Sequence, residues 1–157
     1  MEIALIIRLT VLMLAALATG GLMVNWIGLA RAMARLSSAS RYTELHQATN
    51  QTFDPYMPII AVGALLGGIL LLALSPGIDS ASGQFALAGT FCYAAVMSIA
   101  LLTNVRINKQ IEEWSVQTPP DNWTEIRARW IKFHILRTLF SIPALANYIT
   151  SILLSVR

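Results

Sequence analysis

Charged residues are scarce in this sequence, and so is cysteine. Only 12% of the 157 residues are Asp, Glu, Lys or Arg, whereas soluble domains usually carry about 25%. Much of the surface must therefore face something other than water, in agreement with a mean hydropathy of +0.63. The single cysteine, Cys92, rules out an intrachain disulfide and any thiol relay that needs two cysteines in one chain. The composition indicates a membrane protein with one domain over residues 1–157.

Four apolar runs are long enough to cross a bilayer core, for which about 20 residues suffice. We predict an all-α fold, an antiparallel bundle of four transmembrane helices with short amphipathic extensions at the interface. One such extension is expected between spans one and two and another before span four. The predicted spans are residues 3–30, 57–74, 85–103 and 134–156. Glycines in the second span are expected to let a neighbouring helix approach closely: Gly63, Gly67 and Gly68.

Basic residues are unevenly shared among the three predicted loops. Loop one carries Arg31, Arg35 and Arg41, loop three carries Arg106, Lys109, Arg127, Arg129 and Lys132, and loop two carries none. Positive charge is retained on the cytoplasmic side, so we expect loops one and three in the cytoplasm and both termini outside, in a bacterial inner membrane. The basic residues alternate with acidic ones, which favours membrane lipid as their partner and disfavours nucleic acid despite the net charge of +3.

Two groups of polar residues are expected on the same membrane face. The first loop contributes Glu44, His46, Asn50 and Asp54, and the third contributes Asn104, Asn108, Trp130, His134 and Arg137. On a helix, residues four apart lie on one face, so each group forms a stripe. In an antiparallel bundle the two stripes should converge, and they would bring together both histidines of the chain.

The end of the third span and the start of the fourth form a recognisable pattern. N-V-x-I-N, a linker that contains tryptophan, and W-x-x-x-H-x-x-R resemble the anthrone-oxygenase-like family of small four-helix membrane proteins, most of which have no assigned function. The residues that carry this resemblance are Asn104, Val105, Ile107, Asn108, Trp123, Trp130, His134 and Arg137. Arg106 stands where many relatives have proline. The resemblance implies oxidation of an anthrone-type tricyclic phenol to a quinone by molecular oxygen, the reaction of a monooxygenase.

This chemistry gives the polar residues separate tasks. A modest base, His134 or His46, would remove the acidic carbon-bound proton, and the electron-rich carbanion would react with oxygen. Arg137 or a side-chain amide would stabilise the enolate oxygen. The catalytic residues that we predict are His134, Arg137, Asn104 and Asn108. The predicted substrate-binding residues, which would contact an apolar aromatic small molecule, are Trp130, His46 and Asn50.

Structural roles and a cofactor are the alternatives at the same positions. Tryptophans at a membrane interface commonly form an aromatic belt, and Arg137 has the option of pairing with Asp54 or a lipid phosphate. The weak candidates for metal ligands are Glu44, His46, Asp54 and His134, which lack a compact motif such as H-x-x-E-H. A haem between His46 and His134 is a further alternative. The sequence favours no cofactor.

A non-enzymatic function also stays open. The chain has the size of a membrane scaffold, an assembly factor or a lipid-binding subunit, and a homo-oligomer is compatible with its composition. A proton-coupled exporter would normally place a carboxylate deep within a span. The eight acidic residues of this chain all lie outside the predicted spans, apart from Glu2 at the very start, which weakens the case for transport.

Overall fold

The computed structural model describes residues 2–54 and 56–155, and these residues are almost entirely helical. Seven α-helices and two π-helices follow one another along this part of the chain. They are α1 (Glu2–Val24), η1 (Asn25–Ala30), α2 (Arg31–Ala34), α3 (Ala39–Phe53), α4 (Met57–Ala73), α5 (Ala81–Ile99), η2 (Ala100–Asn104), α6 (Val105–Glu112) and α7 (Trp123–Ser155).

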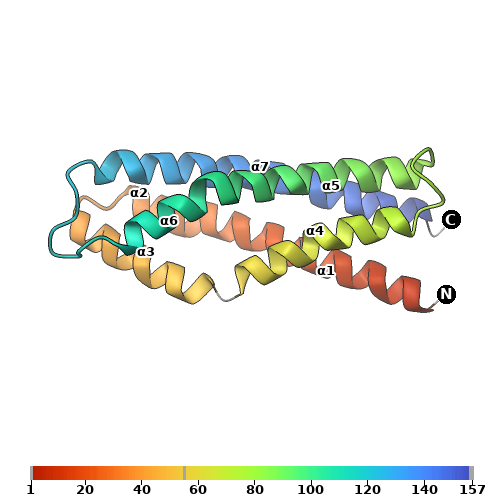
Figure 1. The fold of residues 1–157 in the computed structure, drawn as a ribbon, viewed down its shortest axis with the longest axis horizontal. Coiled ribbons are helices and arrows are strands. Elements are labelled where there is room, and N and C mark those ends of the chain that lie inside the picture. The colour runs from red at the N-terminus through yellow and green to blue at the C-terminus, as the bar shows by residue number, and fades with distance from the viewer. Residues whose placement is uncertain (1, 55, 156–157) are drawn as a thin grey trace.

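The long helices lie side by side in one elongated body (Figure 1). Helix α1 packs on α4 and α7, and α5 packs on α4 and α7, so the four helices enclose a common interior. The chain ends lie at one end of this body, and the segment between α6 and α7 lies at the other, beside α2 and α3 (Figure 1). Three continuous helical segments are long and apolar enough to cross a membrane, and a fourth is counted if α3 and α4 form one bent span.

Local sequence signals explain where several helices begin. Ser38 caps α3 by accepting a hydrogen bond from the backbone N–H of Arg41, and Ser80 caps α5 by accepting one from Gly83 at 3.0 Å. Pro58 lies in the first turn of α4, where the missing N–H of proline costs no helical hydrogen bond. Gly77 has φ +146° in the turn before α5, a conformation that other residues rarely adopt.

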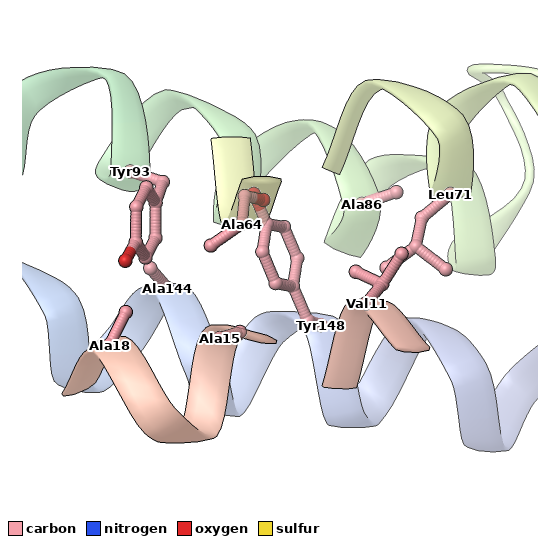
Figure 2. Packing of buried hydrophobic residues seen from close by; sticks show 9 residues of the cluster. All are labelled: Val11, Ala15, Ala18, Ala64, Leu71, Ala86, Tyr93, Ala144 and Tyr148. Carbon is pink, nitrogen blue, oxygen red and sulfur yellow. The ribbon is translucent and has the colours of Figure 1, made fainter. Parts of the chain in front are cut away.

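Small side chains and two tyrosines fill the interior between the long helices (Figure 2). Alanines let the helices approach closely, and the rings of Tyr93 and Tyr148 occupy the space that remains; both tyrosines are fully buried. Tyr148 lies against two glycines, Gly68 of α4 and Gly89 of α5, at which a Cβ would overlap it. Large apolar side chains such as Phe91, 76% exposed, point outward, as expected for a surface that faces lipid.

The helix boundaries differ from the sequence prediction at the polar end of the molecule. The third apolar helix begins at Ala81, passes through η2, and continues as α6, which the sequence pattern had ended at Asn104. The amphipathic segment before span four is the first part of one continuous helix, α7, which also continues through Pro143. The interruptions by η1 and η2 were not predicted, because one extra residue in a helical turn barely changes an apolar run.

Gly89→Ala tests the close packing of α5 on α7. A Cβ at this position would lie 2.6 Å from Cδ1 of Tyr148 and 3.1 Å from the backbone oxygen of Ala144, so the substitution should destabilise the protein by about 1–3 kcal/mol. At Gly20 of α1 an added Cβ meets nothing within 4 Å, so Gly20→Ala should leave the melting temperature unchanged or raise it. Thermal unfolding of both variants in detergent measures the difference, and equal melting temperatures would contradict this packing.

Candidate functional site

A cavity of about 160 Å³ lies where the apolar helices meet α3 and α6. Its inner wall contains the buried side chains of His46, Tyr93 and Trp130. The exposed residues of its lining mark the mouth: Phe53, Asp54, Pro58 and Leu101. The mouth therefore lies between the break that separates α3 from α4 and the π-helix η2. Both π-helices contribute to the lining, in line with the frequent occurrence of π-turns at functional sites.

One side-chain oxygen joins three elements at the inner wall. The Oδ1 of Asn108 on α6 accepts a hydrogen bond from the indole Nε1 of Trp130 on α7 at 2.6 Å, and lies 3.2 Å from Nε2 of His46 on α3. Because an indole N–H only donates, the amide oxygen, and not its nitrogen, must face these two rings. A carbonyl oxygen only accepts, so the His46 Nε2 is the donor.

The protonation of Nε2 leaves Nδ1 of a neutral His46 with a free lone pair. His46 is 1% exposed, it lines the cavity, and its Nδ1 has no hydrogen-bond partner among the described residues. A buried polar atom without a partner is uncommon in folded proteins and calls for an explanation. A lone pair held at the wall of a cavity is able to accept a proton from a bound molecule.

The other histidine, His134, has both ring nitrogens occupied. Its Nε2 lies 3.2 Å from the backbone oxygen of Leu22, so that nitrogen donates, and its Nδ1 accepts from the guanidinium of Arg137, with Nη2 at 2.9 Å. The ring of His134 also stacks on Trp130 with centroids 5.1 Å apart and planes 5° apart. His134 therefore connects α7 to α1 and orients Arg137, which lines the cavity.

Trp130 lies between the two histidines. Its ring centroid is 5.0 Å from that of His46, with an edge-on geometry, and 5.1 Å from that of His134. The indole thus fills the space in which a haem held by both histidines would have to lie. Within residues 2–54 and 56–155, no three His, Cys, Asp or Glu residues are close enough to hold a metal ion together. Of the weak ligand candidates, Glu44 and Asp54 are exposed.

The remaining predicted site residues support the wall from behind or from the side. Asn104 is buried, and its Nδ2 donates to the backbone oxygen of Trp130 at 3.0 Å, which fastens η2 to α7. Asn50 lines the cavity and donates to Oε1 of Glu112 at 2.8 Å. The structure thus brings the two polar stripes together, with Asn104 behind the cavity wall and the others at it.

Two residues of the lining were missed by the sequence analysis, Tyr93 and Asn25. Of the four buried side-chain atoms that lack a partner among the described residues, three belong to residues that line the cavity: Asn25 Oδ1, His46 Nδ1 and Tyr93 OH. The signal was present in the sequence, since each is a polar side chain inside an apolar run. Unsatisfied hydrogen-bonding capacity is therefore concentrated at this one cavity.

An all-helical protein with long apolar helices and a partly polar cavity at the end of its apolar part has the features of a small membrane protein that binds or converts an apolar molecule. A family model described as anthrone oxygenase matches residues 45–146. The chain belongs to this family. The matched part includes His46, Asn108, Trp130 and Arg137. Comparisons with curated proteins and with solved structures found no match.

Replacing Asn108 tests the shared acceptor. In Asn108→Leu the Nε1–H of Trp130 and the Nε2–H of His46 lose their partner while they stay buried, which should cost about 1–3 kcal/mol for each donor. Asn108→Asp keeps an oxygen toward both rings and should retain most of the stability. Thermal unfolding followed by tryptophan fluorescence compares the two variants. If Asn108→Leu were as stable as the native protein, the two contacts would contribute nothing to the fold.

Proposed function

We propose that α1, α4, α5 and α7 form a four-helix antiparallel transmembrane bundle in a bacterial inner membrane. Both termini would lie outside, and the segments after α2 and α6 would lie in the cytoplasm. The position of the termini at one end of the molecule (Figure 1) and the gathering of basic residues toward the other end support this orientation. Helix α3 is polar, unlike α4, so we place it outside the spans, at the cytoplasmic interface.

Within this membrane protein we propose an oxygenase site for a flat, apolar, aromatic substrate with an acidic carbon–hydrogen bond, of the anthrone type. Family membership supports the substrate class, and the location of the cavity mouth supports delivery from the membrane. Phe53, Pro58 and Leu101 at this mouth are exposed. Next to them Ile59 and Leu102 present further apolar surface, 72% and 59% exposed. A molecule dissolved in lipid would reach the cavity from this side.

The single observation that carries the proposal is the free Nδ1 of His46 at the cavity wall. His46 takes the carbon-bound proton of the substrate and becomes an imidazolium, and the electron pair stays on the substrate as a carbanion. The carbanion transfers its electrons to molecular oxygen and forms a carbon–oxygen bond. Loss of water from the resulting peroxide gives the ketone. In total, one CH₂ group and one O₂ become one C=O group and one H₂O, and the imidazolium returns its proton.

Trp130 supports the binding step of this reaction. Its ring is held rigidly by the hydrogen bond to Asn108 and by the stack on His134, and it lines the cavity next to His46. A fixed aromatic surface binds a flat substrate without a loss of side-chain freedom. The substrate then lies beside the base, which is the orientation that proton transfer requires.

His46→Gln tests the base directly. The glutamine amide is able to reproduce the Nε2 donor to Asn108 but lacks a basic nitrogen at the position of Nδ1. Oxygen uptake by the purified protein in nanodiscs with 1,8-dihydroxyanthrone, corrected for the reaction in empty nanodiscs, should fall by about 10²- to 10⁴-fold. Substrate affinity should stay close to that of the native protein.

The matched control is His134→Gln, which changes the other histidine. Because both nitrogens of His134 are engaged by Leu22 and Arg137, this variant should lose stability and should retain catalysis to the extent that it folds. Full activity of His46→Gln would disprove the assignment of the base. Absence of oxygen uptake by the native protein, together with measurable binding of the anthrone, would indicate a binding protein without catalysis.

The pH dependence of the rate provides an independent test. Burial lowers the pKa of His46 to about 4, and the hydrogen bond to Asn108 and the charge of Glu112 oppose this shift only in part. A base acts in its deprotonated form, so a lowered pKa extends activity toward acid. We expect kcat/KM to be level from pH 8 to about pH 5 and to fall only near pH 4, whereas a histidine with the ordinary pKa would cause a fall near pH 6.5. A fall centred near 6.5 would contradict the burial of the base.

A further inference from the structure

Arg137 presents a cation to the cavity that no acidic residue of the cavity wall neutralises. The hydrogen bonds of its guanidinium within the described residues go to one atom, Nδ1 of His134. The one acidic residue of the lining is Asp54, which is exposed at the mouth. A charge among apolar helices is costly unless it is paired. The absence of a protein partner at the inner wall therefore points to a partner that arrives from outside.

Tyr93 adds a second donor in the same cavity. It is fully buried, it lines the cavity, and its hydroxyl has no partner among the described residues. Its ring reaches from α5 into the space between α7 and α1, near Ala144 and Ala18 (Figure 2). Buried tyrosine hydroxyls usually find a hydrogen-bond partner. A guanidinium offers only donors, and a phenol hydroxyl readily donates, so the missing partner is an acceptor that carries negative charge.

The rest of the lining restricts the kind of anion. Arg137 is the one Lys or Arg residue among those that line the cavity, and its neighbours there are apolar, including Val96, Met97 and Ala18. A phosphate or another multivalent anion would require more than one cation for its charge. One guanidinium and one hydroxyl match a single ionised oxygen on an otherwise apolar molecule.

We propose that Arg137 and Tyr93 form an oxyanion site that binds a lipophilic weak acid through its ionised phenol or enol oxygen. On binding, the oxygen gives its proton to water and is held by the guanidinium, which His134 orients. The inference rests on the proposed function, because it concerns the same cavity, and it narrows the substrate class to hydroxylated aromatic molecules. Charge-assisted hydrogen bonds of this type are about twice as strong as neutral ones.

A ligand that cannot react allows this site to be tested apart from catalysis. 2-Hydroxyanthraquinone is flat, is already oxidised, and absorbs at different visible wavelengths as phenol and as phenolate. Titration of this compound in nanodiscs with the native protein, compared with empty nanodiscs, should show ionisation at a lower pH, by about one unit or more, equivalent to about tenfold preference for the anion. 2-Methoxyanthraquinone, which has no acidic proton, serves as the matched ligand.

Three variants separate charge, hydrogen bond and fold. Arg137→Gln should abolish the shift in ionisation, and Arg137→Lys should keep much of it because the charge is retained. Tyr93→Phe removes a hydroxyl that has no protein partner, so it should fold at least as stably as the native protein while it weakens binding of the phenolate. Binding of 2-methoxyanthraquinone should be unchanged in Tyr93→Phe.

The outcomes distinguish this inference from the proposed function. Unshifted ionisation in the native protein, or an equal shift in Arg137→Gln and Tyr93→Phe, would overturn the oxyanion site even if His46→Gln abolished oxygen uptake. A normal shift that depends on Arg137 and Tyr93, in a protein that consumes no oxygen, would support the site and refute the oxygenase. Should Arg137→Gln fail to fold, the comparison of Arg137→Lys and Tyr93→Phe with the native protein decides the matter alone.

Discussion

The Oδ1 atom of Asn108 is the contact on which the polar end of the molecule depends. It joins α6 to α3 through His46 and to α7 through Trp130, three helices that are far apart along the chain. A single acceptor shared by two donors also fixes which nitrogen of His46 carries the proton. The same oxygen thus determines a tertiary arrangement and a protonation state, and both lie on the wall of the cavity.

Around this contact, other polar groups are engaged by the backbone of neighbouring helices. Asn104 donates to the backbone of α7, His134 to that of α1, and Gln47 to the backbone oxygens of Ile111 and Trp114. At the opposite end, alanines and glycines allow helices to touch without polar contacts. The molecule therefore changes along its length from packing by small residues to packing by aromatic rings and hydrogen bonds, and the cavity lies at this transition.

The sequence predicted the helices well, because apolar runs of about 20 residues leave little choice of structure in a membrane. It also predicted that the polar residues of the first and third loops would meet, since both precede or follow spans at the same end. It did not predict which atoms would be free. His46 and His134 have the same side chain, and their difference arises from one backbone oxygen at Leu22 and one amide at Asn108, contacts between residues more than 60 positions apart.

The two π-helices carry a geometric consequence. A π-turn holds one residue more than an α-turn, and each residue advances an α-helix by about 100°. Deletion of one residue from η2 would convert it to a regular helix and rotate everything after it by that angle, which would turn Asn108 away from Trp130. A similar deletion in η1 would rotate the segment that leads to Met33. The chemistry of this chain is therefore sensitive to its length at two places, where a single codon gained or lost separates an assembled site from a plain bundle.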